Sequence, residues 1–299
     1  MTQRILVTGA SGMVGSYAPG VFSDYELILT DSVECPHVLD VREPADVRDM
    51  VGDAKPDVVL HLAAATDVDR CEKEPDWAYH SNAIGTQNVV YACREFDTTL
   101  VYISTAGVFW GDKADPYIEF DEPRPANVYG HSKLAGERYV AHSLRKYFIA
   151  RAGWMVGGGR KDKKFVGQIA RLITEGRTKL KAVDDKLGSP TYAKDLLVGI
   201  EKLLGTELYG LYHMVNEGVC SRYEVALEIK DIIQNDDVSI EPVSSAHFPL
   251  PAPRARSEAM RNLKLELLKI HRMPSWQAAL REYVSGELMP ALEAKEHSE

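Results

Sequence analysis

Tyr129 and Lys133 lie four positions apart in the run Val128-Tyr129-Gly130-His131-Ser132-Lys133, which has the pattern of a helix. Residues at that spacing share one helix face, so an ammonium can sit beside a phenol. A free phenol ionises at about pH 10, and a nearby positive charge favours the phenolate and lowers that pKa. The spacing therefore predicts a tyrosine that acts as a general acid or base. Alone, however, Tyr-x-x-x-Lys more often marks an ordinary solvated helix face.

A glycine-rich segment near the N-terminus predicts a dinucleotide site. It follows the first apolar strand and opens the first expected helix, which is the context that the Gly-x-x-Gly-x-x-Gly spacing needs. Glycines allow a tight turn and close approach to a pyrophosphate, and the helix N-terminus supplies N–H groups for the anion. The cofactor-binding residues expected here are Gly9, Ser11, Gly12, Met13, Val14 and Gly15.

Other cofactor contacts are expected at the ends of further strands, where open parallel sheets bind ligands. Asp31 is placed to accept hydrogen bonds from an adenosine ribose, and its carboxylate would repel the extra phosphate of NADPH, which favours NADH. A cap of the following turn is the alternative role for this aspartate. The remaining candidates are Asp40, Val41, Ser104 and the small residues Ala63, Ala64 and Ala65, which would let a cofactor approach the backbone.

Composition limits the class of protein. The chain has 299 residues and a formal net charge of −9 at pH 7. That charge argues against a general nucleic-acid or acidic-membrane binder, and no apolar stretch approaches the ~20 residues of a membrane span. The four cysteines lack the spacing of a zinc site. We therefore expect a cytoplasmic protein with no metal, no nucleic-acid partner and no membrane partner.

Short apolar strands alternate with helical segments in the first half of the chain, which is typical of an α/β, Rossmann-like, doubly wound parallel sheet. The expected strands are 5–8, 27–30, 58–62, 100–103 and 148–150, and the expected helices are 13–21, 44–51, 75–96 and 129–144.

From residue 151 onward the alternation becomes irregular, which indicates a smaller, partly interleaved C-terminal lobe. Helices are expected at 165–175, 223–233 and 276–288, and the Pro-rich stretch 248–253 is expected to be a loop. We predict a cofactor-binding domain over residues 1–155 with a contribution from about 186–215, and a substrate-binding lobe over 156–299.

Taken together, these motifs resemble those of the extended short-chain dehydrogenase/reductases, and within them the dTDP-4-dehydrorhamnose reductases. The matching segments cover nearly the whole chain and include Ser104-Thr105, Tyr129 to Glu137, Arg151-Ala152-Gly153-Trp154, Gly188-Ser189-Pro190-Thr191 and Gly210-Leu211-Tyr212-His213. The resemblance implies a reductase that uses NADH or NADPH to reduce the C4 ketone of a nucleoside-diphosphate 4-keto-6-deoxy sugar. Members often form homodimers, so a homodimer is implied as well.

The resemblance also assigns roles. Tyr129 would protonate the C4 oxygen, Lys133 would hold the nicotinamide ribose and lower the pKa of Tyr129, and Thr105 would hydrogen-bond the keto oxygen. Trp154 would lie against the sugar, and one or two of the residues Arg160, Lys161, Lys163, Lys164, Arg254 and Arg256 would pair with the diphosphate. The substrate-binding residues implied are Thr66, Val68, Thr105, Ala106, Trp154, Lys164 and Arg254.

The chain departs from the family pattern in the substrate region. Ala106-Gly107 replaces an acid and an aromatic residue, and Lys163-Lys164 replaces a pair of asparagines. Tyr17 stands where some bacterial members have a glutamate that helps to bind magnesium between subunits, so that metal is not predicted. Because the cofactor and catalytic positions are spared, a reductase of a related nucleotide sugar is an open alternative.

Two further functions remain open. A nucleotide-sugar 4-epimerase uses the same hydride chemistry with a tightly bound NAD. The regulatory subunit of methionine adenosyltransferase resembles these reductases and binds a dinucleotide without catalysis. Dehydration is disfavoured, because dehydratases carry an Asp-Glu pair where this chain has Ala106 and Gly107.

Overall fold

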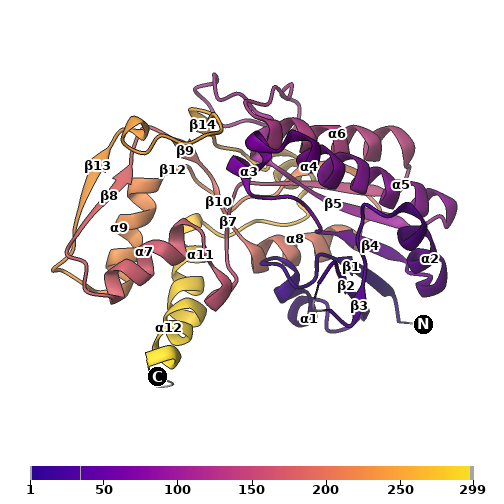
Figure 1. Ribbon diagram of the computed structural model, residues 1–299, viewed down its shortest axis with the longest axis horizontal. Helices are drawn as coiled ribbons and strands as arrows, with labels where there is room; N and C mark the ends of the chain where they lie inside the picture. Colours follow the sequence, from indigo (N-terminus) through magenta and orange to yellow (C-terminus); the bar gives the residue numbers. More distant parts are fainter. Residues whose placement is uncertain (1, 34, 297–299) are drawn as a thin grey trace.

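The computed structural model describes residues 2–33 and 35–296 of the chain. It consists of a large body built on a central sheet and a smaller lobe that contains the C-terminal helix (Figure 1). None of the helices in the described residues is long and apolar enough to cross a membrane.

The central sheet has seven parallel strands in the order β11-β6-β5-β4-β1-β2-β3. The order reverses between β1 and β4, and in such sheets ligands bind beyond the carboxyl ends of the strands at this point. The predicted Rossmann-like fold class is confirmed. In chain order the strands are β1 (Arg4–Thr8), β2 (Glu26–Asp31), β3 (His37–Val38), β4 (Val58–His61), β5 (Thr99–Thr105), β6 (Tyr147–Ala152) and β11 (Gly210–His213).

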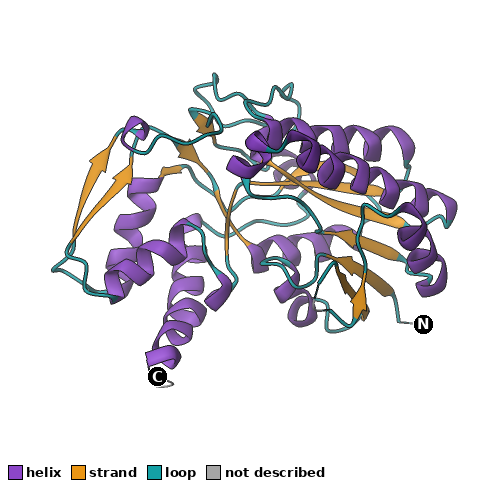
Figure 2. Ribbon diagram, viewed as in Figure 1, coloured by secondary structure: helices purple, strands orange, loops and turns teal. Residues whose placement is uncertain are grey.

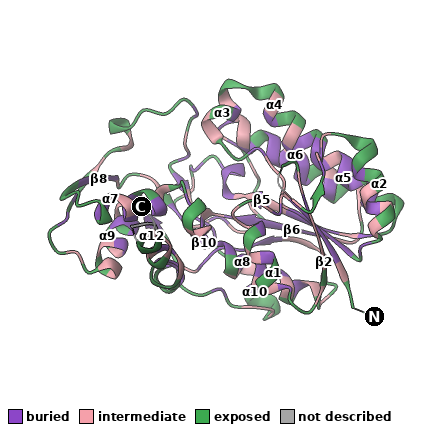
Figure 3. Cartoon of the chain, turned by 60° about the horizontal axis from the view of Figure 1, so that its bottom comes forward, coloured by how far each residue is buried: buried purple, intermediate pink, exposed green. Residues whose placement is uncertain are grey.

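Helices cover both faces of this sheet (Figure 2). Side chains alternate between faces along a strand: Leu6 joins a core with α2, α5 and α6, whereas Ile5 and Val7 join a core with α1 and α8. Figure 3 shows the sheet buried and the outer helix surfaces exposed. The helices of this body are α1 (Ala18–Val21), α2 (Pro44–Ala54), α3 (Val68–Lys73), α4 (Pro75–Tyr79), α5 (Gly85–Glu95), α6 (Val128–Ser143), α8 (Ala193–Leu204) and α10 (Leu263–Leu268).

Two expected helices differ in detail from the prediction. The expected helix 13–21 starts late, as a 3-10 turn at Gly15–Tyr17 followed by only four α-helical residues, because the residues before Gly15 form the glycine turn. The expected helix 75–96 is α4 and α5 joined by a π-helical segment, His80–Ile84. Residues far from the N-terminus also join the body, since β11 pairs with β6.

The smaller lobe has its own apolar core. The last expected helix, 276–288, continues through a π-helical turn, Val284–Leu288, into α12, and the stretch 248–253 is a loop as predicted. The domain boundaries themselves stay a prediction. The helices are α7 (Phe165–Thr174), α9 (Arg222–Ile233), α11 (Trp276–Tyr283) and α12 (Met289–Glu296), and the paired strands are β7 (Trp154–Val156) with β10 (Pro190–Tyr192), β8 (Lys179–Val183) with β13 (Ser239–Val243), and β9 (Leu187–Gly188) with β12 (Cys220–Ser221) and β14 (Ser257–Glu258).

Helix α6 packs very closely on the loop that follows β5. A Cβ atom built on Gly130 would overlap the carbonyl oxygen of Gly107 and would lie 2.9 Å from Cβ of Pro125. The side chain of Asn127 caps the helix by accepting a hydrogen bond from the N–H of Gly130 at 2.9 Å, and a carboxylate oxygen of Glu72 accepts one from the N–H of Val128 at 3.0 Å. These contacts fix the first turn of α6, which carries Tyr129.

We expect Gly130→Ala to destabilise the protein, although alanine is the better helix former by about 1 kcal/mol. The added methyl group has no room against the backbone of Gly107, and overpacking of this kind typically costs roughly 1–3 kcal/mol. Gly20→Ala is the matched control, because Gly20 is also helical and a Cβ there meets nothing within 4 Å. Urea unfolding should show a loss for Gly130→Ala alone. Equal stability of the two variants would contradict the close contact.

Candidate active site

A cavity of about 930 Å³ opens at the carboxyl ends of the strands, between the body and the smaller lobe. Its volume lies near the upper end of the range for ligand pockets. The cavity brings every predicted site residue together, although their individual roles stay predictions. Those residues are Gly9, Ser11, Gly12, Met13, Val14, Gly15, Asp31, Asp40, Val41, Ala63, Ala64, Ala65, Thr66, Val68, Ser104, Thr105, Ala106, Tyr129, Lys133, Trp154, Lys164 and Arg254.

The glycine turn packs directly on the segment that follows β4. Gly9 has a left-handed φ of 71°, and a Cβ there would lie 2.6 Å from the backbone nitrogen of Ala63. The turn closes through a hydrogen bond of 3.1 Å from the N–H of Gly12 to the carbonyl of Gly9. Backbone therefore lines this part of the cavity, as the close approach of a dinucleotide requires.

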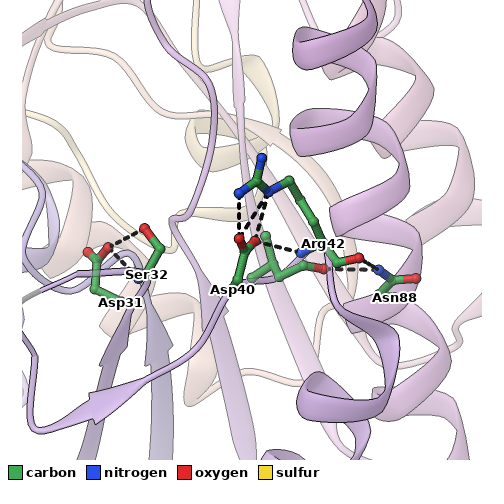
Figure 4. A network of polar contacts seen from close by, with 6 residues as sticks. Asp31, Ser32, Asp40, Arg42 and Asn88 are labelled. Atoms are coloured by element: carbon green, nitrogen blue, oxygen red, sulfur yellow. Dashed lines mark hydrogen bonds and ion pairs between the residues drawn. The ribbon is translucent and has the colours of Figure 1, made fainter.

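Two aspartates follow the glycine turn along the cavity wall. Asp31 accepts hydrogen bonds from the N–H and hydroxyl of Ser11, at 3.1 and 2.5 Å, so this carboxylate also supports the glycine turn. Figure 4 shows Asp31 bonded to Ser32, and Asp40 bonded to the guanidinium of Arg42. The Arg42 guanidinium holds the pKa of Asp40 below its usual range. The preference between NADH and NADPH stays a prediction.

The three predicted catalytic residues line this cavity, Thr105 at the end of β5 and Tyr129 with Lys133 on α6. Thr105 lies within hydrogen-bonding reach of Tyr129, and that contact lowers the pKa of the phenol, whereas burial raises it more strongly, to about 12. Thr105 Oγ1 also accepts a hydrogen bond from the N–H of Gly107 at 3.0 Å. At neutral pH the phenol is therefore protonated and holds a proton to donate.

That Lys133 lowers the pKa of Tyr129 stays a prediction; the largest influence on this phenol is its burial, which raises its pKa. The ammonium of Lys133 lies over the ring of Tyr102, 4.2 Å from its centroid. Burial lowers the pKa of Lys133 to about 7, against the opposing charge of Glu137. Burial thus favours the neutral form of Lys133, which weakens its field at the phenol.

Buried polar groups surround Lys133. His61 bridges Thr8 and Thr86 through its two ring nitrogens, at 2.8 and 3.1 Å, and burial lowers its pKa to about 3. It is a neutral core histidine and not a ligand-binding one. One turn beyond Lys133, Glu137 forms a buried two-bond ion pair with Arg151, at 2.8 and 2.7 Å.

The lobe side of the cavity holds Trp154, whose indole N–H donates to a carboxylate oxygen of Glu258 at 2.8 Å. Of the six basic residues considered from the sequence, Lys164 and Arg254 line the cavity. Arg254 is paired with Asp69 at 3.0 Å, on the helix α3 of the large body. The other four are exposed and lie outside the lining: Arg160, Lys161, Lys163 and Arg256.

Sequence reasoning missed four charged residues that line the cavity. Arg42 follows Asp40 by two positions and was detectable from that motif alone. No sequence motif marks the other three, Arg222, Lys186 and Glu258. They lie on α9, in the turn before β9 and on β14, and these segments come to the cavity only when the chain is folded.

Comparison with known proteins gives consistent similarities over nearly the whole chain. Residues 3–288 match the family described as RmlD substrate binding domain. The dTDP-4-dehydrorhamnose reductase of Mycolicibacterium smegmatis is 34% identical, with 96% of this chain and 86% of that protein covered. The dTDP-4-dehydrorhamnose reductase from Bacillus anthracis, solved in complex with NADP, has a TM-score of 0.90 and 38% identity, covering 96% of this chain and all of that one (100%).

A UDP-glucose 4-epimerase of Thermus thermophilus, solved in complex with NAD, is similar in fold only. It has a TM-score of 0.80 and 22% identity, with 95% of this chain and 98% of that one covered.

The lowered pKa of Lys133 predicts how stability depends on pH. The unfolded lysine keeps its proton up to its ordinary pKa of 10.5, whereas the folded one loses it at about 7. The buried charge therefore costs most below pH 7, and the cost falls as the pH rises toward 10.5. Lys133→Met should raise the free energy of unfolding at about pH 6 by on the order of a few kcal/mol, since one pKa unit corresponds to about 1.4 kcal/mol.

Denaturant unfolding at a series of pH values measures this effect. The gain for Lys133→Met should shrink steadily above about pH 7. Lys179→Met serves as the control, because Lys179 is exposed on β8, and surface substitutions usually change stability by less than about 0.5 kcal/mol. A gain that does not vary with pH would contradict the lowered pKa.

Proposed function

The chain belongs to the RmlD substrate-binding family, and from this premise we propose that it reduces dTDP-4-dehydro-L-rhamnose to dTDP-L-rhamnose with NADPH. The single observation that carries the proposal is that Thr105, Tyr129 and Lys133 line the same cavity as the glycine turn. Relatives that match over nearly the whole chain are named as reductases of this sugar nucleotide. The protein is accordingly an oxidoreductase.

The residues of the chain fit a dinucleotide reductant. The left-handed glycine turn leaves backbone exposed to the cavity, and Ser104 has a buried hydroxyl with no partner among the described residues. A bound nicotinamide would supply the hydride for the ketone. Asp31 and Asp40 would lie at the adenosine end, and Lys133 at the nicotinamide ribose.

The chain itself supplies the proton and the orientation of the ketone. Thr105 donates a hydrogen bond to the C4 oxygen, where negative charge develops during hydride transfer. Tyr129, a neutral phenol of high pKa, then gives its proton to that oxygen. Trp154, held by Glu258, forms the platform on which the sugar ring lies.

The proposal is tested by supplying the full chain with NADPH and dTDP-4-dehydro-L-rhamnose. We expect steady loss of NADPH absorbance and an NMR spectrum of dTDP-L-rhamnose as product. Parallel reactions with NADH, and with the GDP- and CDP-linked sugars, define the cofactor and nucleotide preference. No turnover of any of these substrates would reject the reductase and favour a binding subunit, and tightly bound NAD in the purified protein would favour an epimerase.

Tyr129→Phe removes the proposed proton donor while keeping the ring. We expect turnover to fall by roughly 10²–10⁴-fold, which is the usual contribution of a general acid, with cofactor binding preserved. Tyr139→Phe is the control, because Tyr139 lies on the same helix, outside the cavity. Near-normal turnover by Tyr129→Phe would show that Tyr129 is not the proton donor.

A homodimer and a cytoplasmic location also stay predictions.

A further inference from the structure

Arg222 presents a guanidinium to the cavity from the first residue of α9. Its Cζ atom lies 3.8 Å from the centroid of the Trp154 ring and 5.1 Å from that of Phe165. An arginine in contact with two aromatic rings loses little freedom when it binds an anion, because its planar group is already oriented. The same tryptophan is the proposed sugar platform.

This guanidinium has no bonded counter-ion. Among the described residues, none accepts a hydrogen bond from it or pairs with it at ion-pair distance. The charge of Glu258 acts on Arg222, but an oxygen of that carboxylate accepts the indole N–H of Trp154. Burial lowers the pKa of Arg222 only to about 10, so its charge remains at neutral pH.

Lys164 is a second cation in the same part of the cavity. Its ammonium likewise has no bonded partner in the described part of the chain, and burial together with the charge of Arg222 lowers its pKa. The two groups therefore repel each other inside one cavity, and this repulsion costs free energy. The two neighbouring cations Arg254 and Lys186 differ, since Arg254 pairs with Asp69 and Lys186 donates to a backbone carbonyl.

We propose that Arg222 binds the diphosphate of the nucleotide-linked substrate beside Lys164, for which the family resemblance already implies this role, and that Arg222 is the residue that distinguishes a nucleoside diphosphate from a monophosphate. The inference rests on the proposed function, because the diphosphate is the anionic part of a dTDP-linked sugar. An arginine can donate two parallel hydrogen bonds to phosphate oxygens. Because Arg222 stacks on Trp154, binding of the diphosphate also holds the sugar platform in place.

The test is equilibrium binding of dTDP and dTMP to the full chain by calorimetry, so that no turnover is required. Wild type should bind dTDP more tightly than dTMP. Arg222→Met should weaken dTDP roughly 10- to 100-fold, the range for a lost charge-assisted hydrogen bond, with little effect on dTMP. Arg222→Lys, which keeps the charge and loses the planar stack, should fall between the two. NADPH binding should be unchanged in both variants, which also shows that they are folded.

Arg177→Met is the matched control, since Arg177 is an exposed arginine of the same lobe that does not line the cavity. Equal dTDP affinity of wild type and Arg222→Met would overturn the inference, and so would equal losses of affinity for dTDP and dTMP.

The reductase proposal and the proposal for Arg222 are contradicted by different results. If dTDP binds through Arg222 but no 4-keto sugar is reduced, the reductase proposal fails alone; if the sugar is reduced and Arg222→Met binds dTDP normally, only the role of Arg222 fails.

Discussion

The close packing of α6 on the loop after β5 is the constraint on which the active site depends. No side chain separates the helix backbone at Gly130 from the carbonyl of Gly107. This brings the residue that ends the strand, Thr105, within hydrogen-bonding reach of Tyr129 in the first helical turn. The hydroxyl of Ser132, which donates to the carbonyl of Tyr129 and accepts from the amide of Asn82, holds the same turn from the opposite side.

Burial then sets the chemistry of the residues so placed. It raises the pKa of Tyr129 and lowers that of Lys133, so both groups favour their neutral forms in the same low-dielectric site. A neutral phenol suits the donation of a proton to a developing alkoxide. Glu137, in its buried ion pair with Arg151, opposes the lowering of the Lys133 pKa, but desolvation is the larger effect.

In the proposed function, the smaller lobe contributes specificity and the body contributes reactivity. Trp154 is the first residue of β7, two positions after the end of β6. Its indole ring contacts the guanidinium of Arg222 on α9, and its N–H donates to Glu258 on β14. Arg254 ties this lobe to α3 of the body through Asp69. The cavity is thus closed by contacts between segments that are far apart in the chain. The charged groups Arg222 and Glu258 on its lobe side come from α9 and β14, whereas Asp31 beside the glycine turn comes from β2.

Local pattern was enough to predict the parallel α/β sheet, the glycine turn, and the shared face of Tyr129 and Lys133, because each depends on spacing within one or two turns or strands. It was also enough to select residues that line one cavity. Tertiary structure decided the start of the first helix, the position of Lys133 over Tyr102, and the contact of Arg222 with Trp154. Burial and stacking depend on segments that meet only in the folded chain, so the spacing of residues along the sequence does not predict them.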